Sequence, residues 1–309
     1  MISIFRYPGG KTKKSVQNTI LRYAPEEIRE YREPFVGGGG IFFALDGKSN
    51  FNGLVREEPE VRWINDSNQD LVEVYLALRD RAEEFIAKCK DIKPMQKGEP
   101  VAYPTENSSG KQYNARLMKK FKELIADKSD RAFSYYFVNR TVWGGRVNYD
   151  MPSRLYFSNP EGWNIVSTNR LERAAQHIAG AKITCGDFEP LLKAKGEGVW
   201  IYCDPPYVRD TNLAAPSKLY QMGFSMEDHE RLRDCVLESP HQVCLSYDED
   251  EDGAVRDLYS DSRFNIYSKQ WTYCGTSSAD GASKTKTRGK ELVITNYKPP
   301  KIKKTPKIF

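Results

Sequence analysis

Short apolar runs alternate with amphipathic stretches along most of the chain. Runs that are rich in β-branched or aromatic residues and bounded by turn residues predict buried strands. These runs are Val61–Asn65, Ala181–Cys185, Val199–Cys203, Gln242–Ser246, Phe264–Trp271 and Glu291–Tyr297. Helical spacing of apolar residues separates them, in the segments 71–82, 165–178 and 225–237. Ser225, with Asp228 three residues later, predicts a capping box at the start of the last of these segments. Alternating strands and helices predict an α/β fold with an open, mostly parallel sheet, and the last two strands predict an antiparallel hairpin.

The pattern changes between residues 92 and 164. Strand-like runs give way there to two Lys/Arg-rich helical segments, 112–126 and 129–141, and then to a Gly-rich stretch. The Pro/Gly/Ser-rich segment 94–110 predicts a flexible entrance to this region. We therefore expect residues 1–91 and 165–297 to form the core domain, 92–164 a mainly helical insertion, and the Lys/Pro-rich residues 298–309 a flexible basic tail.

The composition is that of a folded protein. The 309 residues include 39% apolar and 12% aromatic side chains, and no apolar run approaches the roughly 18 residues that a membrane span needs. The N-terminal sequence reaches a basic residue at Arg6 and a Pro-Gly pair directly afterwards, so it lacks the apolar stretch of a secretory signal. A cytoplasmic location is expected.

The cysteines and histidines do not form a metal-binding pattern. Six cysteines lie far apart with no C-x-x-C pair, and the three histidines are not neighbours. A zinc site is not predicted. Cys185, Cys203 and Cys244 sit in apolar runs and are expected to be buried, reduced thiols.

Positive charge is concentrated in parts of the chain. The five lysines of residues 298–309 account for the whole net charge of +5, so residues 1–297 have no net charge. Binding of a nucleic acid by that part would therefore require its positive and negative charges to lie on different surfaces. Bases outnumber acids in residues 1–32, 101–150 and 269–290, while acids cluster at 248–252. We expect the acidic cluster to be a loop that faces away from a polyanion, although each basic stretch alone is also typical of a solvated surface.

A glycine run follows the first predicted strand. Glu33-Pro34-Phe35-Val36 leads into Gly37–Gly40 and the apolar segment 41–45, which predicts a strand, a glycine turn and the start of a helix. Such a turn lets the backbone approach a ligand closely, but a purely structural tight turn explains it about as well. The spacing fits neither a dinucleotide fingerprint nor a phosphate-binding P-loop.

Asp66 ends the next predicted strand, in Asn65-Asp66-Ser67-Asn68. An acid at this position can accept both hydroxyls of a ribose. The alternative role is to cap the following helix, for which Asn68 is the better candidate.

Asp204-Pro205-Pro206-Tyr207 ends the strand Val199–Cys203. Two adjacent prolines stop the sheet and leave the Asp204 carboxylate and the Pro205 carbonyl as acceptors beside an aromatic ring. Two acceptors suit the two N–H bonds of an exocyclic amine on a base that stacks on Tyr207. They would localise the nitrogen lone pair, which is otherwise delocalised into the ring. A simple turn is the alternative.

Taken in order, these motifs resemble those of the Dam-type adenine-specific DNA methyltransferases. The matching segments are Tyr7-Pro8-Gly9-Gly10-Lys11, Glu33–Gly39, Asn65–Leu71, Cys185-Gly186-Asp187-Phe188, Asp204–Tyr207 and the closing strand Glu291–Tyr297. The resemblance therefore covers all but the tail. It implies a Rossmann-like methyltransferase sheet with an inserted target-recognition domain.

The resemblance also implies S-adenosylmethionine as methyl donor and assigns residues to it. Tyr7 and Lys11 would contact the methionine end, and Asp204 would lie close to it. Phe35, Gly37 and Gly39 would form the floor, Asp66 would bind the ribose hydroxyls, and Asp187 and Phe188 would meet the adenine. Asp204, Pro205, Pro206 and Tyr207 would hold the target base and form the catalytic set. No metal is expected, because the methyl group is already activated on a sulfonium.

Residues of the insertion resemble the start of the family's target-recognition region. Asn139-Arg140-Thr141-Val142-Trp143-Gly144-Gly145 matches it, but Gly144 replaces the usual Asn and Asn148 the usual Arg. Arg146 is a candidate to supply the guanidinium instead, since Arg reads guanine and phosphate equally well. The DNA-binding residues expected are Asn139, Arg140, Arg146 and Lys13, and the usual GATC target is in doubt.

The sequence thus predicts a site-specific methyltransferase that flips an adenine out of duplex DNA and methylates its 6-amino nitrogen. A restriction endonuclease partner is compatible with this prediction. The alternatives are methylation of another amine, such as that of cytosine, of adenine in RNA or of a glutamine side chain, and a DNA-binding protein without catalysis.

Overall fold

The computed structural model describes residues 4–7, 10–45, 47, 50–51, 54–55, 57–92, 101–102, 113–127, 129–141, 168–208, 223–249, 252–272 and 288–300. The chain divides into two compact units. The first comprises Met1–Thr12, Val36–Asp46 and Ile64–Gly186, and the second comprises Lys13–Phe35, Gly47–Trp63 and Asp187–Phe309. Residues 92–164, the predicted insertion, belong to the first unit, and the boundaries predicted for the core and the insertion stay a prediction.

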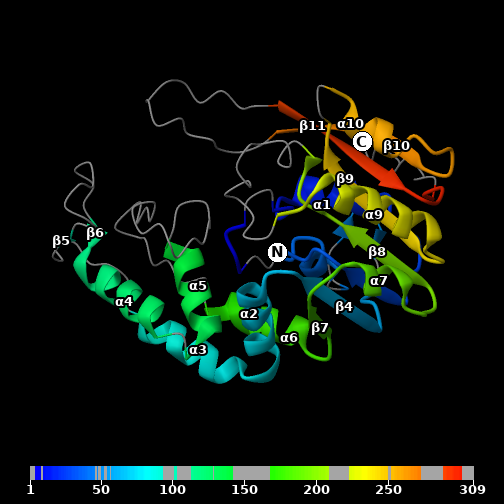
Figure 1. Cartoon of the computed structure of the whole chain (residues 1–309). Coiled ribbons are helices and arrows are strands. Elements are labelled where there is room, and N and C mark those ends of the chain that lie inside the picture. The colour runs from blue at the N-terminus through cyan, green and yellow to red at the C-terminus, as the bar shows by residue number, and fades with distance from the viewer. Residues whose placement is uncertain are drawn as a thin grey trace, which may run out of the picture. The chain divides into compact units, whose positions relative to one another are not determined.

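The main sheet has seven strands in the order β10, β11, β9, β8, β1, β4, β7 (Figure 1). The strands are β1 Glu30–Glu33, β4 Val61–Asp66, β7 Lys182–Cys185, β8 Val199–Cys203, β9 Gln242–Asp248, β10 Asn265–Thr272 and β11 Arg288–Thr295. β1 pairs with β8 and β8 with β9 in parallel, whereas β11 is antiparallel to both β9 and β10. The predicted α/β class and the antiparallel hairpin of the last two strands are confirmed.

Helices separate the strands as the periodicity predicts. In the first unit they are the 3-10 helix η1 Phe42–Ala44 and the α-helices α2 Gln69–Asp80, α3 Ala82–Asp91, α4 Ala115–Ala126, α5 Arg131–Thr141 and α6 Thr168–Ile178. In the second unit they are α1 Lys14–Leu21, α7 Glu189–Lys193, α9 Met226–Glu238 and α10 Ala254–Leu258. Two short strand pairs complete the described elements: β2 Asn50–Phe51 with β3 Leu54–Val55, and β5 Val101–Ala102 with β6 Tyr113–Asn114.

Two helix starts predicted from sequence are formed as expected. The Asn68 side chain accepts hydrogen bonds from the backbone N–H groups of Asp70 and Leu71 and caps α2. Ser225 and Asp228 form a reciprocal capping box at the start of α9. Each cap satisfies backbone donors that the helix itself leaves unpaired.

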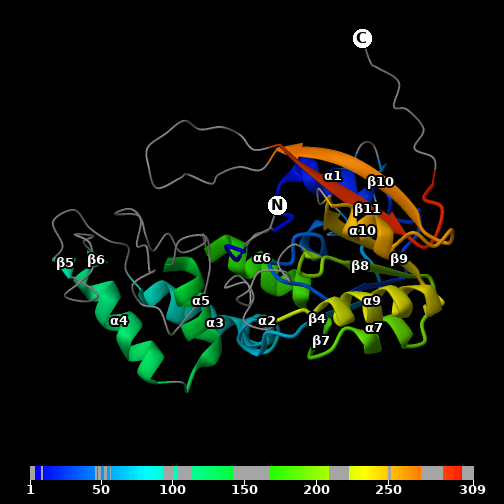
Figure 2. The ribbon, with the colours of Figure 1, turned by 45° about the horizontal axis from the view of Figure 1, so that its top comes forward.

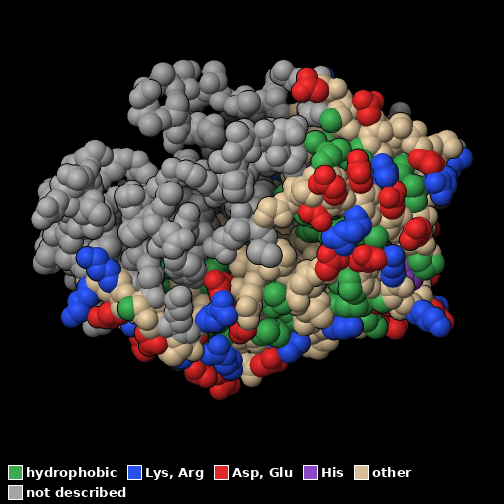
Figure 3. All heavy atoms as spheres, in the orientation of Figure 1, with side chains coloured by type: hydrophobic (Ala, Val, Ile, Leu, Met, Phe, Trp, Pro, Cys, Tyr) green, Lys and Arg blue, Asp and Glu red, His purple; other side chains and the backbone are tan. Residues whose placement is uncertain are grey.

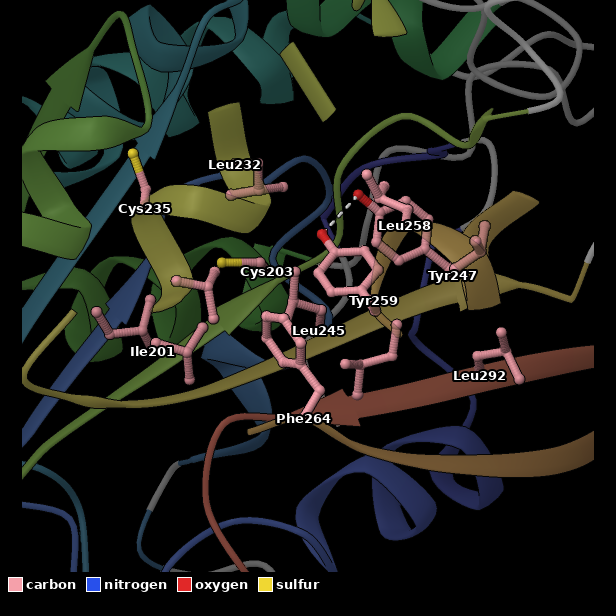
Figure 4. Packing of buried hydrophobic residues seen from close by; sticks show 14 of the residues in the cluster. Ile201, Cys203, Leu232, Cys235, Leu245, Tyr247, Leu258, Tyr259, Phe264 and Leu292 are labelled. Atoms are coloured by element: carbon pink, nitrogen blue, oxygen red, sulfur yellow. Dashed lines mark hydrogen bonds between the residues drawn. The ribbon is translucent and has the colours of Figure 1, made fainter. Parts of the chain in front are cut away.

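The core of the second unit lies between its strands and α9. Ile201 and Leu245 project from the adjacent strands β8 and β9 against Leu232 of α9, and all three are fully buried (Figure 4). α7 and α9 lie side by side along one face of these strands (Figure 2). Burial of each such aliphatic side chain stabilises the fold by roughly 1.5–3 kcal/mol, which makes the β8–β9 pair a rigid base for the residues that follow it.

The core of the first unit is largely aromatic. The ring of Phe85 in α3 lies 5.4 Å from Tyr136 and 6.5 Å from Phe133, both in α5. Every residue from Ala132 to Asn139 is buried. The helix predicted at 129–141 is confirmed as α5, but it is not amphipathic, because α2, α3 and α4 all pack against it.

Other sequence expectations also need correction. The segment after the glycine turn forms only the 3-10 helix η1, so no α-helix N-terminus follows this turn. Cys185 is exposed, because it ends the edge strand β7, whereas Cys203 and Cys244 are buried as predicted. Asp248 is a buried residue of β9 and not part of an acidic loop.

Surface charge is mixed where the structure describes it. The described part of the face in Figure 3 carries Lys and Arg interspersed with Asp and Glu. The tail from residue 301 and most of the basic stretch 269–290 lie outside the described residues. No helix among the described segments has both the length and the apolar character required to cross a membrane.

Candidate functional site

The glycine turn and Asp66 are joined by hydrogen bonds in the first unit. Gly37 and Gly39 have φ values of +46° and +67°, which favour glycine. The Gly37 N–H donates to Asp66 Oδ2 and the Asn68 N–H to Asp66 Oδ1, both at 2.9 Å. Asp66 therefore does not cap the helix, which is the role of Asn68, but holds the turn next to the end of β4.

Burial shapes the chemistry of Asp66. Its side chain is only 8% exposed, and desolvation raises the pKa of its carboxyl, while the backbone N–H groups of Asn68 and Gly37 oppose that rise. A carboxylate has about four lone-pair sites, more than these two donors use. The arrangement can accept further hydrogen bonds from paired hydroxyl donors.

Tyr7 and Lys11 lie against the same turn. A Cβ atom at Gly37 would lie 2.8 Å from Cε1 of Tyr7, and one at Gly40 would lie 2.8 Å from the Lys11 backbone. The Lys11 side chain is buried. The first unit thus brings together five predicted donor-binding residues, namely Tyr7, Lys11, Gly37, Gly39 and Asp66, whereas Pro8 and Gly9 of the same motif lie outside the described residues.

Tyr75 of α2 contacts this turn, and the sequence motifs do not reveal it. Its hydroxyl donates to the Gly37 carbonyl at 2.8 Å, and a Cβ at Gly39 would lie 2.8 Å from the same hydroxyl oxygen. In the sequence Tyr75 is one apolar position of the helical stripe of α2. Only the position of α2 beside the turn distinguishes it from an ordinary core residue.

An aromatic cluster forms in the second unit around Phe188. The rings of Phe35 and Phe224 lie 5.4 and 5.9 Å from that of Phe188, and 5.7 Å from each other. The Arg231 guanidinium lies 4.3 Å from the centre of the Phe188 ring. Phe224 and Arg231 are missing from the sequence prediction, because they lie more than 30 residues along the chain from Phe188.

Arg231 also holds Asp187. Its two terminal nitrogens donate to Asp187 Oδ1 and Oδ2 at 2.9 and 2.8 Å. This bidentate pair is the main cause that lowers the pKa of Asp187. Asp187 is therefore kept ionised, with its carboxylate plane fixed beside Phe188.

The Asp-Pro-Pro-Tyr motif directly follows β8. Asp204 Oδ1 accepts a hydrogen bond of 2.7 Å from Ser246 Oγ of β9, and Ser246 Oγ lies 2.7 Å from the Tyr202 hydroxyl. Asp204 and Pro206 are half-buried, while Pro205 and Tyr207 are buried. The Tyr207 ring lies 6.3 Å from that of Tyr247, so it is supported by a second aromatic side chain.

The predicted DNA-binding residues lie in different settings. Asn139 is fully buried and forms a reciprocal pair with the Arg6 backbone, accepting from its N–H at 3.0 Å and donating to its carbonyl at 2.8 Å. Its observed role is to hold the N-terminal segment. Burial lowers the pKa of Arg140, and the positive charges of Arg6 and Arg170 lower it further. Lys13 precedes α1, and Arg146 lies outside the described residues.

A comparison with known families decides what kind of protein carries these features. The D12 class N6 adenine-specific DNA methyltransferase family matches residues 7–274, which include every motif of the candidate site. The chain belongs to this family. It is an enzyme that methylates adenine in DNA, and its family uses S-adenosylmethionine as methyl donor. The family match therefore favours adenine in DNA as the substrate over the other amines considered. It also favours an enzyme over a DNA-binding protein without catalysis.

Individual relatives of this methyltransferase agree with the family match. It is 28% identical over 302 residues to a type II methyltransferase, M1.LlaDCHI, of Lactococcus lactis, with 94% of each chain covered. It is 24% identical over 290 residues to a DNA adenine methylase of Vibrio cholerae, with 92% of each covered. A DNA N-6-adenine-methyltransferase of Escherichia phage P1 is 28% identical over 271 residues, which make up 85% of this chain and 32% of the phage protein.

Proposed function

We propose that this methyltransferase binds S-adenosylmethionine through Tyr7, Lys11, Phe35, Gly37, Gly39, Asp66, Asp187, Phe188 and Asp204. We propose further that it holds the target adenine with Asp204, Pro205, Pro206 and Tyr207. Two carboxylates held by hydrogen bonds, one buried and one half-buried, carry the proposal. Asp66 is held by a glycine turn, and Asp204 is held at the end of β8 beside Tyr207.

The first unit suits the amino-acid and ribose parts of the donor. Gly37 and Gly39 leave room where a Cβ would collide with Tyr7 or Tyr75, so the backbone can approach a ligand closely. Asp66 would accept hydrogen bonds from the two ribose hydroxyls, and Lys11 would face the carboxylate of the methionine end. These residues fit an amino-acid nucleoside better than a pyrophosphate.

The second unit suits an adenine ring. Phe35, Phe188 and Phe224 provide apolar ring surfaces in mutual contact, and Asp187 provides an ionised acceptor that Arg231 orients. An acceptor of this kind can bind the amino group of the donor's adenine. Phe224 and Arg231 are thereby added to the residues that the sequence motifs assign.

Asp204 and Pro205 would activate the target amine. The Asp204 carboxylate and the Pro205 carbonyl each accept one N–H bond of the 6-amino group, which localises the nitrogen lone pair and offsets the positive charge that develops there. Asp204 can take the proton that nitrogen loses once it carries the methyl group. S-adenosylmethionine, when bound, supplies that methyl group already activated on sulfur.

Positioning would account for most of the rate. Alignment of two bound reactants supplies roughly 7–11 kcal/mol of the barrier, whereas flipping a base costs only about a few kcal/mol. Arg140, Arg146 and Lys13 remain the proposed contacts with duplex DNA, whereas the predicted contact by Asn139 is not retained, because Asn139 is fully buried and both its amide atoms bind the Arg6 backbone. A cytoplasmic site of action and a restriction endonuclease partner are also part of the proposal, and no metal is required for this chemistry.

Identification of the methylated nucleoside tests the proposal. The full chain is incubated with unmethylated duplex DNA and S-adenosylmethionine that carries a labelled methyl group, and the DNA is digested to nucleosides for mass analysis. The expected product is N6-methyldeoxyadenosine, with none formed by Asp204→Ala. Label in deoxycytidine, or undiminished label with Asp204→Ala, would overturn the assignment.

A further inference from the structure

Asp204 ends a chain of three hydrogen-bonded side chains, of which the other two lie on the neighbouring strands β8 and β9. Ser246 Oγ lies 2.7 Å from Asp204 Oδ1 and 2.7 Å from the hydroxyl of Tyr202. The parallel register pairs Tyr202 with Cys244 and Cys203 with Leu245, so Asp204, which directly follows β8, comes next to Ser246 of β9. Tyr202 and Ser246 are fully buried. The contact is thus built into the central pairing of the sheet.

The direction of both hydrogen bonds follows from the hydroxyl protons available, one on Ser246 and one on Tyr202. An ionised carboxylate only accepts, so the single hydroxyl proton of Ser246 goes to Asp204. The Ser246 oxygen can then only accept from Tyr202. Burial, together with the charge of Asp204, raises the pKa of Tyr202 well above its usual value, so the tyrosine keeps the proton that it donates.

We propose that Ser246 and Tyr202 are positioning residues for methyl transfer: Ser246 fixes the plane of the Asp204 carboxylate, and Tyr202 fixes Ser246. The inference rests on the proposed role of Asp204. Rotation of a carboxyl group about its last torsion is soft, and Asp204 lies where the strand has ended and two prolines follow. Because Ser246 holds Oδ1 of Asp204, the other oxygen of this carboxylate has a fixed direction, which we propose is toward the amine of the target adenine.

Neither residue touches the substrate in this proposal, so the test must separate positioning from stability. The variants are Ser246→Ala, Ser246→Thr, Tyr202→Phe and the double variant Ser246→Ala/Tyr202→Phe, all in the full chain. Single-turnover and steady-state methyl transfer to duplex DNA are measured at saturating donor, together with the KM for DNA and the melting temperature.

Ser246→Ala is expected to lower kcat by about 10- to 100-fold with the KM for DNA changed less than about twofold, since small misplacements cost this much in rate. Ser246→Thr keeps the hydroxyl and is expected to restore most of the rate. Tyr202→Phe is expected to lower kcat by about three- to tenfold. The double variant is expected to be no slower than Ser246→Ala, because Tyr202 acts only through Ser246.

Tyr297→Phe serves as the matched control. The Tyr297 hydroxyl accepts from Trp200 Nε1 at 3.0 Å and donates to the Tyr23 carbonyl at 2.6 Å, so its removal loosens the same strand β8 at a different place. It is expected to lower the melting temperature and leave kcat unchanged.

Three results would overturn the inference. They are a normal kcat in Ser246→Ala, effects of the two single variants that add up in the double variant, and a loss of rate in Tyr297→Phe equal to that in Tyr202→Phe. If Ser246→Ala does not fold, Tyr202→Phe decides alone, because it removes one oxygen atom and must still lower kcat. Full activity of Asp204→Ala would instead overturn the proposed function itself.

Discussion

The two carboxylates of the candidate site are held in different ways. In the first unit Asp66 accepts from the backbone N–H groups of Gly37 and Asn68. In the second unit Asp204 accepts from the Ser246 side chain, which is held in turn by Tyr202. The backbone fixes the first acid, and side chains of two strands fix the second.

Under the proposed function, Asp66 would serve binding and Asp204 would serve the chemistry. A backbone cradle is rigid and suits the recognition of a ligand that is present in every cycle. A carboxylate held by a hydroxyl can exchange hydrogen bonds while a proton leaves the amine. The following predictions test this division, starting with the largest expected effect.

Removal of Asp204 should stop the chemistry. Asp204→Ala is expected to lower kcat by about 10³-fold or more, because one acceptor for the amine and the proton acceptor are lost together. Retention of DNA in a mobility-shift assay should stay at the wild-type level. A variant that loses DNA binding in parallel with activity would place Asp204 outside the chemical step.

Removal of Asp66 should weaken binding of the donor. Asp66→Ala is expected to raise the Kd for S-adenosylmethionine by about 10- to 100-fold, as two charge-assisted hydrogen bonds disappear. Calorimetry measures the constant, and kcat at saturating donor should fall far less than in Asp204→Ala. An unchanged Kd would remove Asp66 from the donor site.

Two glycines allow the rigidity of the turn to be tested. Gly39 and Gly180 have similar φ values of +67° and +74°, but a Cβ at Gly39 would lie 2.8 Å from the Tyr75 hydroxyl, whereas one at Gly180 would meet nothing within 4 Å. Gly180→Ala reports backbone strain alone, about 1–2 kcal/mol.

Gly39→Ala should destabilise the protein by about 1–3 kcal/mol beyond this control, because the collision forces the neighbours to move. Chemical denaturation measures both variants. Equal losses of stability would show that the turn yields easily and would contradict a rigid cradle.

His229 should make the second unit sensitive to acid. This histidine is fully buried with Nδ1 3.0 Å from the Tyr247 hydroxyl, and burial lowers its pKa from 6.5 to about 4. The unfolded chain therefore binds the proton first, and stability falls as the pH drops from about 6.5 toward 4. Between pH 7 and pH 6 the expected loss is about 0.7 kcal/mol.

Denaturation across this pH range measures the loss. His229→Gln should show a flatter dependence of the free energy of unfolding on pH over the same interval. An identical slope in the variant would assign the acid sensitivity to another group.

The local pattern of residues predicted the strands and the helix starts well. Strand Val199–Cys203 and the capping box at Ser225 follow from apolar runs and side-chain chemistry within a few residues. Asp66 and Asn68 lie two positions apart, so their separate roles could be weighed in advance. The burial of α5 could not be predicted, because its own residues do not show that three other helices pack against it.

The sequence by itself determined the order of motifs, the α/β class and the acids at the strand ends, since each depends on neighbours in the chain. Only the tertiary structure decided which distant side chains hold them. Ser246 lies 42 positions from Asp204, Arg231 44 positions from Asp187 and Asn139 133 positions from Arg6. Those contacts depend on strand register and helix packing, which bring together groups whose spacing in the chain carries no periodic signal.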